Sequence, residues 1–241
     1  MKPHPLCVTA LLLAACQSVQ LSTGYEARQP TTGPGGEEPL NVGFLMVNGV
    51  YNTELIAPFD VFHHTMFHTR PGMRVFTVAP SRRVVTSFEG LRLLPDHTYE
   101  SAPPIDILVV ASAEHSMDTD LADEDMIAWV RKVGGGADYI VSLCDGAFVL
   151  AEAGLLDGLE STTFPSDIAA YRELFPHLEV HEGVSFVHDG KAITSMGGAR
   201  SYEAALYLCE LLYGDQAARG IARGICIDWD LGQIPCRIVE R

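Results

Sequence analysis

The sequence predicts an α/β fold, a three-layer sandwich with helices on both faces of a mostly parallel central sheet and a cysteine nucleophile elbow. Apolar runs of strand length alternate with helical patterns along the chain. One run, Ile105–Ala111, is apolar almost throughout, as expected of a parallel strand that is buried on both faces. Another run ends at Cys144, and a helical pattern begins at Gly146. This second pattern predicts a sharp strand-to-helix turn at the cysteine.

The first half of the domain alternates strand and helix. Val42–Val47 is a short apolar run, and Glu54–His68 follows it with amphipathic spacing. Val75–Ala79 and Ile105–Ala111 are further apolar runs of strand length. Ala122–Val133 has helical periodicity. We expect this helix to end at the three glycines that follow, because glycine costs about 1 kcal/mol in a helix interior.

The second half repeats the alternation and adds a hairpin. Ile140–Leu143 predicts a strand, and Gly146–Ala153 predicts a helix that Gly154 ends. The remaining expected elements are a helix at Ser166–Phe175, a hairpin of Phe186–His188 with Lys191–Thr194 around Asp189-Gly190, and helices at Ser201–Tyr213 and Ala217–Ile227.

The N-terminus predicts an export segment outside the folded domain. Leu6–Ala15 is an apolar stretch of ten residues, which is too short to span a bilayer and suits a signal peptide. Leu13–Cys16 resembles a bacterial lipobox, in which the cysteine is lipidated; the alternative is an ordinary secretory signal. We expect a signal peptide at residues 1–16, lipidation at Cys16, a flexible tether at 17–39 and one domain at 40–241. The protein would then be periplasmic and held on a bacterial membrane by this lipid anchor.

The composition is that of an acidic globular protein. Its 31 acidic and 16 basic residues give a formal net charge of −15, which argues against nucleic acid as a partner. In the 241 residues, 47% are hydrophobic, enough for one full core. We expect the partner to be a small-molecule substrate or ligand, and we expect no cofactor.

Cys144 and Asp145 each allow two interpretations. The N-terminal amides of the following helix would stabilise a Cys144 thiolate, but a buried structural cysteine is equally consistent with the spacing. Asp145 is either a general acid and base beside the thiolate or the cap of that helix. As a neighbouring charge, Asp145 would also oppose thiolate formation.

Three segments resemble the ThiJ/PfpI superfamily, which has a class I glutamine amidotransferase-like fold. They are SLCDGAFVLAEAGLLDGLESTTFP, like the cysteine elbow of the family, NVGFLMVNGVYNTELIAPFDVFHH, like its first strand and helix, and TSMGGARSYEAALYLCELLYG, like its closing helix. Together they cover about residues 40–213. The nearest branches are the isonitrile hydratases and the amidase-like domain of AraC-type regulators. The resemblance also allows a homodimer.

The resemblance implies roles for particular residues. Cys144 would be the nucleophile, and Glu54 the acid that shares a proton with it. The backbone amides of Ser112, Ala113 and Asp145 would form an oxyanion hole, although Ser112-Ala113 replaces the usual Gly-Gly pair. Phe164 stands where the hydrolytic members carry a histidine, which argues against an ordinary cysteine–histidine dyad.

The residues therefore leave two functions open. The first is a cysteine-dependent enzyme that hydrates or hydrolyses a small molecule, with isonitrile hydratase-like lyase chemistry as the nearest analogue. The second is a ligand-binding or thiol redox-sensing module that uses the same pocket. We expect no metal: His64 and His68 have ligand spacing, but Thr65 follows His64 where a zinc protease has glutamate. A disulfide between Cys226 and Cys236 also stays open.

Overall fold

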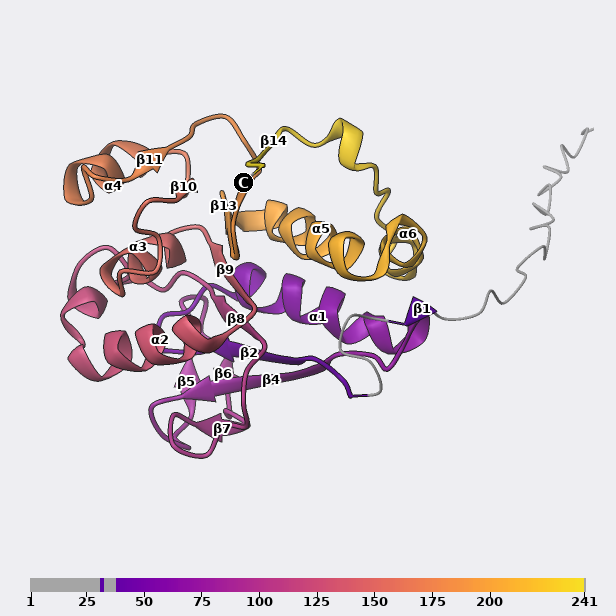
Figure 1. Cartoon of the computed structure of the whole chain (residues 1–241). Helices are drawn as coiled ribbons and strands as arrows, with labels where there is room; N and C mark the ends of the chain where they lie inside the picture. The colour runs from indigo at the N-terminus through magenta and orange to yellow at the C-terminus, as the bar shows by residue number, and fades with distance from the viewer. Residues whose placement is uncertain (1–30, 33–37, 241) are drawn as a thin grey trace, which may run out of the picture.

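The computed structural model describes residues 31–32 and 38–240 (Figure 1). Its centre is an eight-stranded sheet of order β14-β12-β13-β9-β8-β2-β4-β7. Within this sheet every neighbouring pair is parallel except β12 with β13. The strands are β2 (Asn41–Leu45), β4 (Arg74–Ala79), β7 (His97–Thr98), β8 (Ile107–Val110), β9 (Tyr139–Leu143), β12 (Phe186–Asp189), β13 (Ala192–Ser195) and β14 (Cys236–Ile238).

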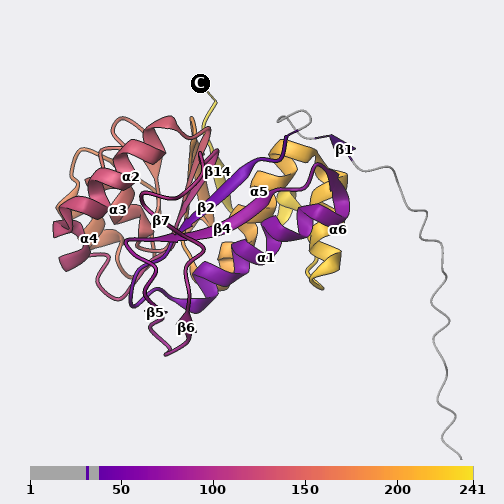
Figure 2. The same cartoon turned by 90° about the horizontal axis from the view of Figure 1, so that it is seen from below.

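Helices cover both faces of the sheet, which confirms the predicted three-layer α/β fold (Figures 1 and 2). One face packs against α1 (Asn52–His68), α5 (Ser201–Tyr213) and α6 (Asp215–Gly224), and the other against α2 (Glu124–Gly136), α3 (Gly146–Glu152) and α4 (Ile168–Leu174). Alternate residues of β8 supply the two cores: Ile107 and Val109 face one, and Leu108 and Val110 face the other. A strand buried on both faces explains the unbroken apolar run.

The expected end of α2 was wrong. The helix continues through all three glycines to Gly136. Gly134 packs so closely that an added Cβ would lie 2.5 Å from Leu155 Cδ1. Lys191 Nζ donates to the carbonyl oxygens of Gly134 and Gly135 at 2.7 and 2.9 Å, which satisfies the helix C-terminus. Contacts from distant parts of the chain therefore outweigh the low helix propensity of glycine.

Other boundaries differ by a few residues, and several short elements were not predicted. The α6 helix ends at Gly224 rather than at residue 227, whereas α5 and the β12–β13 hairpin match the expected ranges closely. The unpredicted elements are the strand pairs β1 (Thr31–Thr32) with β3 (Thr69–Arg70), β5 (Val85–Thr86) with β6 (Arg92–Leu93) and β10 (Glu160–Ser161) with β11 (Glu179–Val180), and the 3-10 helices η1 (Thr119–Ala122), η2 (Gly198–Arg200) and η3 (Leu231–Gln233).

The predicted signal segment and Cys16 lie outside the described residues, as does most of the expected tether. Among the described residues, no helix combines the length and the hydropathy that a membrane span needs. Cys226 and Cys236 are both free in the structure, so the disulfide that the sequence left open is not formed there. Cys209 is fully buried in the core beside α1 and α6.

Candidate active site

Cys144 lies at the carboxyl end of β9, where the chain turns sharply into α3. Its φ angle is +54°, a left-handed backbone conformation that residues other than glycine rarely adopt. Its amide donates to the carbonyl oxygen of Ser195 at 2.9 Å, which ties the turn to the end of β13. A strained residue at the carboxyl edge of a parallel sheet is in the usual position for a functional group.

Two glycines allow this turn to pack against its surroundings. A Cβ on Gly146 would lie 2.1 Å from the carbonyl oxygen of Val110, at the end of the neighbouring strand β8. A Cβ on Gly197 would lie 2.4 Å from Cys144 Cβ. The glycines therefore serve the close approach of three segments and not flexibility.

Glu54 lies in the first turn of α1 and is 5% exposed. Ser112 Oγ donates to Glu54 Oε2, and the amide of Gly198 donates to Oε1 at 3.1 Å. The carboxyl group also lies near enough to Cys144 for each group to shift the pKa of the other. Burial raises the pKa of Glu54, and these hydrogen bonds oppose the rise only in part. The structure thus brings Glu54 and Cys144 together.

The environment of the thiol differs from the expectation based on the helix alone. Burial raises the pKa of Cys144, and the charges of Glu54 and Asp145 raise it further. The amide of Asp145 donates toward the sulfur and acts in the opposite direction, but it does not reverse the shift. Before substrate binds, the local environment therefore favours the neutral thiol.

Asp145 points into the site and does not cap α3. Its side chain makes no cap hydrogen bond. Instead Oδ1 accepts from Thr163 Oγ1 at 3.0 Å, and Oδ2 accepts from Cys144 Sγ at 3.7 Å. Burial, with the charge of Asp167 next, raises the pKa of Asp145 to about 6. A carboxyl group in that range can exchange a proton near neutral pH.

One of the three expected oxyanion amides, that of Ala113, is already engaged in a hydrogen bond. Ala113 N–H donates to Ser116 Oγ at 2.8 Å. The amide of Ser112 is directed to Glu54, and that of Asp145 to Cys144. An oxyanion would have to displace Ser116 from Ala113, so this segment differs from a preformed oxyanion hole.

Two residues at the site were not singled out from the sequence. Tyr51 precedes α1, and burial and the neighbouring charges of Cys144 and Glu54 raise the pKa of its phenol. Thr163 Oγ1 contacts both Asp145 and the carbonyl oxygen of Cys144, each at 3.0 Å. The Thr-Thr pair after the elbow was a signal for Thr163, whereas nothing local distinguishes Tyr51.

Among the described residues, no hydrogen bond or ion pair joins a histidine to Cys144. Phe164 stands at the rim with 38% of its surface exposed. His115 lies in the loop after β8, where its Nδ1 is 3.5 Å from Asp118 Oδ1. The described groups that contact or act on the thiol are therefore carboxyl groups, a phenol and hydroxyl groups.

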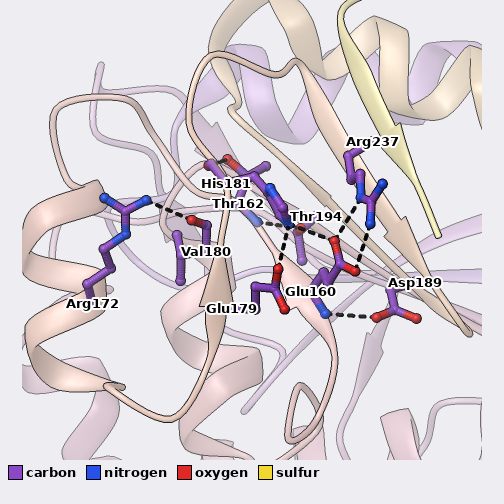
Figure 3. Close-up of polar contacts among 9 residues, drawn as sticks. All are labelled: Glu160, Thr162, Arg172, Glu179, Val180, His181, Asp189, Thr194 and Arg237. Carbon is purple, nitrogen blue, oxygen red and sulfur yellow. Dashed lines mark hydrogen bonds and ion pairs between the residues drawn. The ribbon is translucent and has the colours of Figure 1, made fainter.

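One cluster in the described part of the chain has the spacing of metal ligands, and it lies outside this site. Glu160, Glu179 and His181 bring their ligand atoms within 4.8 Å of one another (Figure 3). Both carboxylate oxygens of Glu160 accept from Arg237 of β14, at 2.8 and 3.0 Å. The guanidinium group already supplies a positive charge there, and the cluster ties β10 and β11 to the C-terminal strand. His64 is turned to its own helix, where its Nδ1 lies 2.9 Å from the carbonyl oxygen of Asp60.

Comparison with known proteins assigns this architecture to a family. The DJ-1/PfpI family model matches residues 41–211. Isonitrile hydratase of Pseudomonas putida is 32% identical over 183 residues, which are 75% of each chain. The transcriptional regulator CdhR of Pseudomonas aeruginosa is 28% identical over 176 residues, and the match spans 50% of the regulator. A ThiJ/PfpI family protein from Pseudomonas syringae superposes with a TM-score of 0.72 at 23% identity, covering 86% of this chain and 84% of the other.

Proposed function

The chain belongs to the DJ-1/PfpI family, and we propose that it is a cysteine-dependent enzyme that hydrates or hydrolyses a small molecule. The observation that carries the proposal is the arrangement at the elbow, where the strained Cys144 lies between two carboxyl groups with raised pKa values, Glu54 and Asp145. Perturbed titratable groups around a candidate nucleophile are typical of catalytic sites. Hydration of an isonitrile is the nearest specific reaction, supported by the similarity to isonitrile hydratase.

The site can supply each proton that this reaction needs. The sulfur of Cys144 would bond to the terminal carbon of the isonitrile as Asp145 gives its proton to that carbon, which forms a thioimidate. The thiol proton passes to the carboxyl groups, so that proton number is conserved. Water then adds to the thioimidate carbon, the carbon–sulfur bond breaks, and the sulfur recovers a proton. The net change is R–NC plus water to R–NH–CHO.

The test is turnover by the purified protein with a panel of neutral isonitriles, followed as formamide by liquid chromatography. Cys144→Ala is expected to abolish turnover, because it removes the nucleophile. Cys226→Ala is the matched control, because Cys226 is exposed, free and not among the site residues. Full turnover in Cys144→Ala would contradict the assignment of the nucleophile.

A second candidate is a non-catalytic module for ligand binding or thiol redox sensing. It is favoured by the buried thiol with its raised pKa, by the engaged amide of Ala113 and by Phe164 in place of a histidine. Similarity to transcriptional regulators agrees with such a module, although the chain spans only about half of their length. Under this hypothesis ligand binding, measured by calorimetry, survives in Cys144→Ala.

We also propose that the chain is exported and lipidated at Cys16. The support is the sequence pattern at Leu13–Cys16. In bacterial cells that express the full chain, radiolabelled palmitate should label the wild type but not Cys16→Ser, and only the wild type should sediment with membranes. Labelling of Cys16→Ser would contradict this proposal. Homodimer formation likewise stays a prediction, for which light scattering of the purified protein is the measurement.

A further inference from the structure

We infer that the site selects substrates by charge: it takes molecules that are uncharged or cationic where they approach Cys144, and it rejects anions. The inference concerns the substrate class of the proposed reaction and rests on Cys144 being the group that meets the substrate. It follows from the distribution of acidic and basic groups around the thiol.

Acidic groups approach the thiol from three parts of the fold. Glu54 comes from the first turn of α1 and lies near enough for its charge to act on the Cys144 thiol. Asp145, at the start of α3, places Oδ2 at 3.7 Å from Sγ. Asp167, directly before α4, is close enough to Asp145 for its charge to act on that carboxyl group. Above the Asp145 pKa of about 6, an approaching anion meets the negative charges of Asp145 and Asp167, and Glu54, whose pKa burial raises, adds its charge where it is ionised.

A fourth acidic group, Glu114, lies near Tyr51. The segments around Tyr51 and Glu114 run side by side: Glu114 N–H donates to Gly49 O at 3.0 Å, and Tyr51 N–H donates to Ser112 O at 3.1 Å. Glu114 is exposed, and its charge acts on the Tyr51 phenol. Phe88 packs on Tyr51 with ring centroids 4.6 Å apart. Aromatic faces beside carboxylates favour cations over anions.

Two basic groups that lie near these segments along the chain are already paired. Arg200, which follows the Gly198 that binds Glu54, forms an ion pair with Glu203 of α5. His115, next to Glu114, pairs with Asp118. No hydrogen bond or ion pair within residues 38–240 links a lysine or arginine to Cys144, Glu54 or Asp145. In the described part of the chain, the hydrogen bonds and ion pairs of these three residues therefore supply no cation of the kind that a carboxylate or phosphate substrate would need.

The test uses three methanethiosulfonate reagents of similar reactivity: a neutral methyl, a cationic ethylammonium and an anionic ethylsulfonate reagent. In each case the Cys144 sulfur displaces methanesulfinate and forms a mixed disulfide. Rates at Cys144 in the purified full chain are read by peptide mass spectrometry and divided by the rates with 2-mercaptoethanol. The degree of thiol ionisation is common to all three reagents, so it cancels from their ratios.

We expect the cationic reagent to modify Cys144 at least about tenfold faster than the anionic reagent at low ionic strength. The ratio should shrink in 0.5 M salt, because ions screen exposed charges. Glu114→Gln and Asp167→Asn should each reduce the ratio by about two- to threefold. The matched control is Glu240→Gln, which removes an exposed carboxylate beyond the end of β14 that is away from Cys144 and should leave the ratio unchanged.

An anionic reagent that reacts as fast as the cationic one would overturn the inference, and so would absence of labelling at Cys144 by all three reagents. An equal fall in Glu240→Gln and Glu114→Gln would also overturn it, because the ratio would then report net charge and not the site. Because labelling needs no turnover, the proposed enzyme activity can fail while charge selection holds. Conversely, active protein with no charge preference would reject the charge selection alone.

Discussion

Two glutamates that are both largely withdrawn from solvent show opposite behaviour. Glu54, 5% exposed, has hydroxyl and amide donors but no cationic partner, and burial raises its pKa. The Glu160 side chain, 13% exposed, binds Arg237 through both oxygens and also contacts His181, and Arg237 lowers its pKa (Figure 3). A buried carboxyl group without a cation therefore has a raised pKa and can exchange a proton, whereas a carboxylate paired with a guanidinium group stays ionised and holds two strands together.

The strongest test of this comparison is Glu54→Gln. We expect turnover to fall about 10³-fold, because the variant cannot exchange a proton with the thiol. Because its pKa is raised, Glu54 binds a proton more tightly in the folded protein than in the unfolded chain. Protonated Glu54 therefore adds to the free energy of unfolding at acid pH, and this contribution is lost as the pH rises through the pKa of Glu54 in the folded protein. The variant should therefore lose less thermal stability than the wild type between pH 5 and pH 8.

The melting midpoint of both proteins at the two pH values checks this sign. Glu160→Gln is the matched control, because it makes the same change where the carboxylate has a cationic partner. A Glu54→Gln protein with wild-type turnover would contradict the catalytic role. A steeper loss of stability with pH in the variant than in the wild type would contradict the raised pKa.

Asp145→Asn is expected to have the next largest effect, a fall in turnover of about 10²-fold. The Asp145 pKa of about 6 predicts that wild-type turnover declines as pH rises through that value, because the acid form is the proton donor. Asparagine does not titrate, so this limb of the pH–rate profile should be absent in the variant. The measurement is turnover between pH 4.5 and 8, and an unchanged limb in Asp145→Asn would assign the titration to another group.

Changes to the ion pair between Glu160 and Arg237 should alter stability and leave turnover unchanged, the opposite of changes at the site. Arg237→Met removes the guanidinium group and should leave turnover unchanged, because neither Arg237 nor Glu160 forms a hydrogen bond or ion pair with Cys144 in the structure. We expect the melting midpoint to fall by a few degrees at most (about 1–3 °C), since ion pairs of half-exposed side chains stabilise little. Because folding lowers the pKa of Glu160, the ion pair stabilises the protein fully at pH values above the pKa that Glu160 has in the unfolded chain. This stabilisation is lost as the pH falls through the pKa of Glu160 in the folded protein.

Differential scanning calorimetry at pH 7 and pH 3.5 measures the Arg237→Met effect. The loss should be larger at pH 7 than at pH 3.5, because Glu160 attracts Arg237 less as its carboxylate becomes protonated at falling pH. A Glu160→Gln variant should reproduce the loss at pH 7. Equal losses at both pH values would show that Arg237 acts through packing alone.

The smallest expected effect is that of Thr163 on the pKa of Asp145. Thr163 donates to Asp145 and thereby lowers its pKa in part. Thr163→Val removes this donor, so the declining limb of the pH–rate profile should move to higher pH by less than about 1 unit. Thr163→Ser retains the hydroxyl and should keep the wild-type limb. If serine and valine variants shift the profile alike, the hydroxyl does not set the proton affinity of Asp145.

Much of this protein can be predicted from local patterns in its sequence. The unbroken apolar run of β8, the period of α5 and the strand–cysteine–glycine sequence at Cys144 each depend on neighbouring residues, and the structure reproduces all three elements. Resemblance over residues 40–213 agrees with the family match over 41–211. Glu54 beside Cys144 was inferred from the same resemblance, and the two residues lie together in the structure.

Tertiary structure alone decided the protonation chemistry of the site. Glu54 accepts from Ser112 across 58 residues and from Gly198 across 144, so no local window contains its environment. The same holds for Ala113, whose amide is occupied by Ser116, and for Asp145, which faces Thr163 instead of capping α3. Backbone preference is set by adjacent residues, whereas a pKa depends on the solvent excluded and the charges brought near by folding. Local patterns in the sequence were therefore enough to predict the fold and the place of Cys144 at the turn, whereas folding set the pKa shifts of the groups around it.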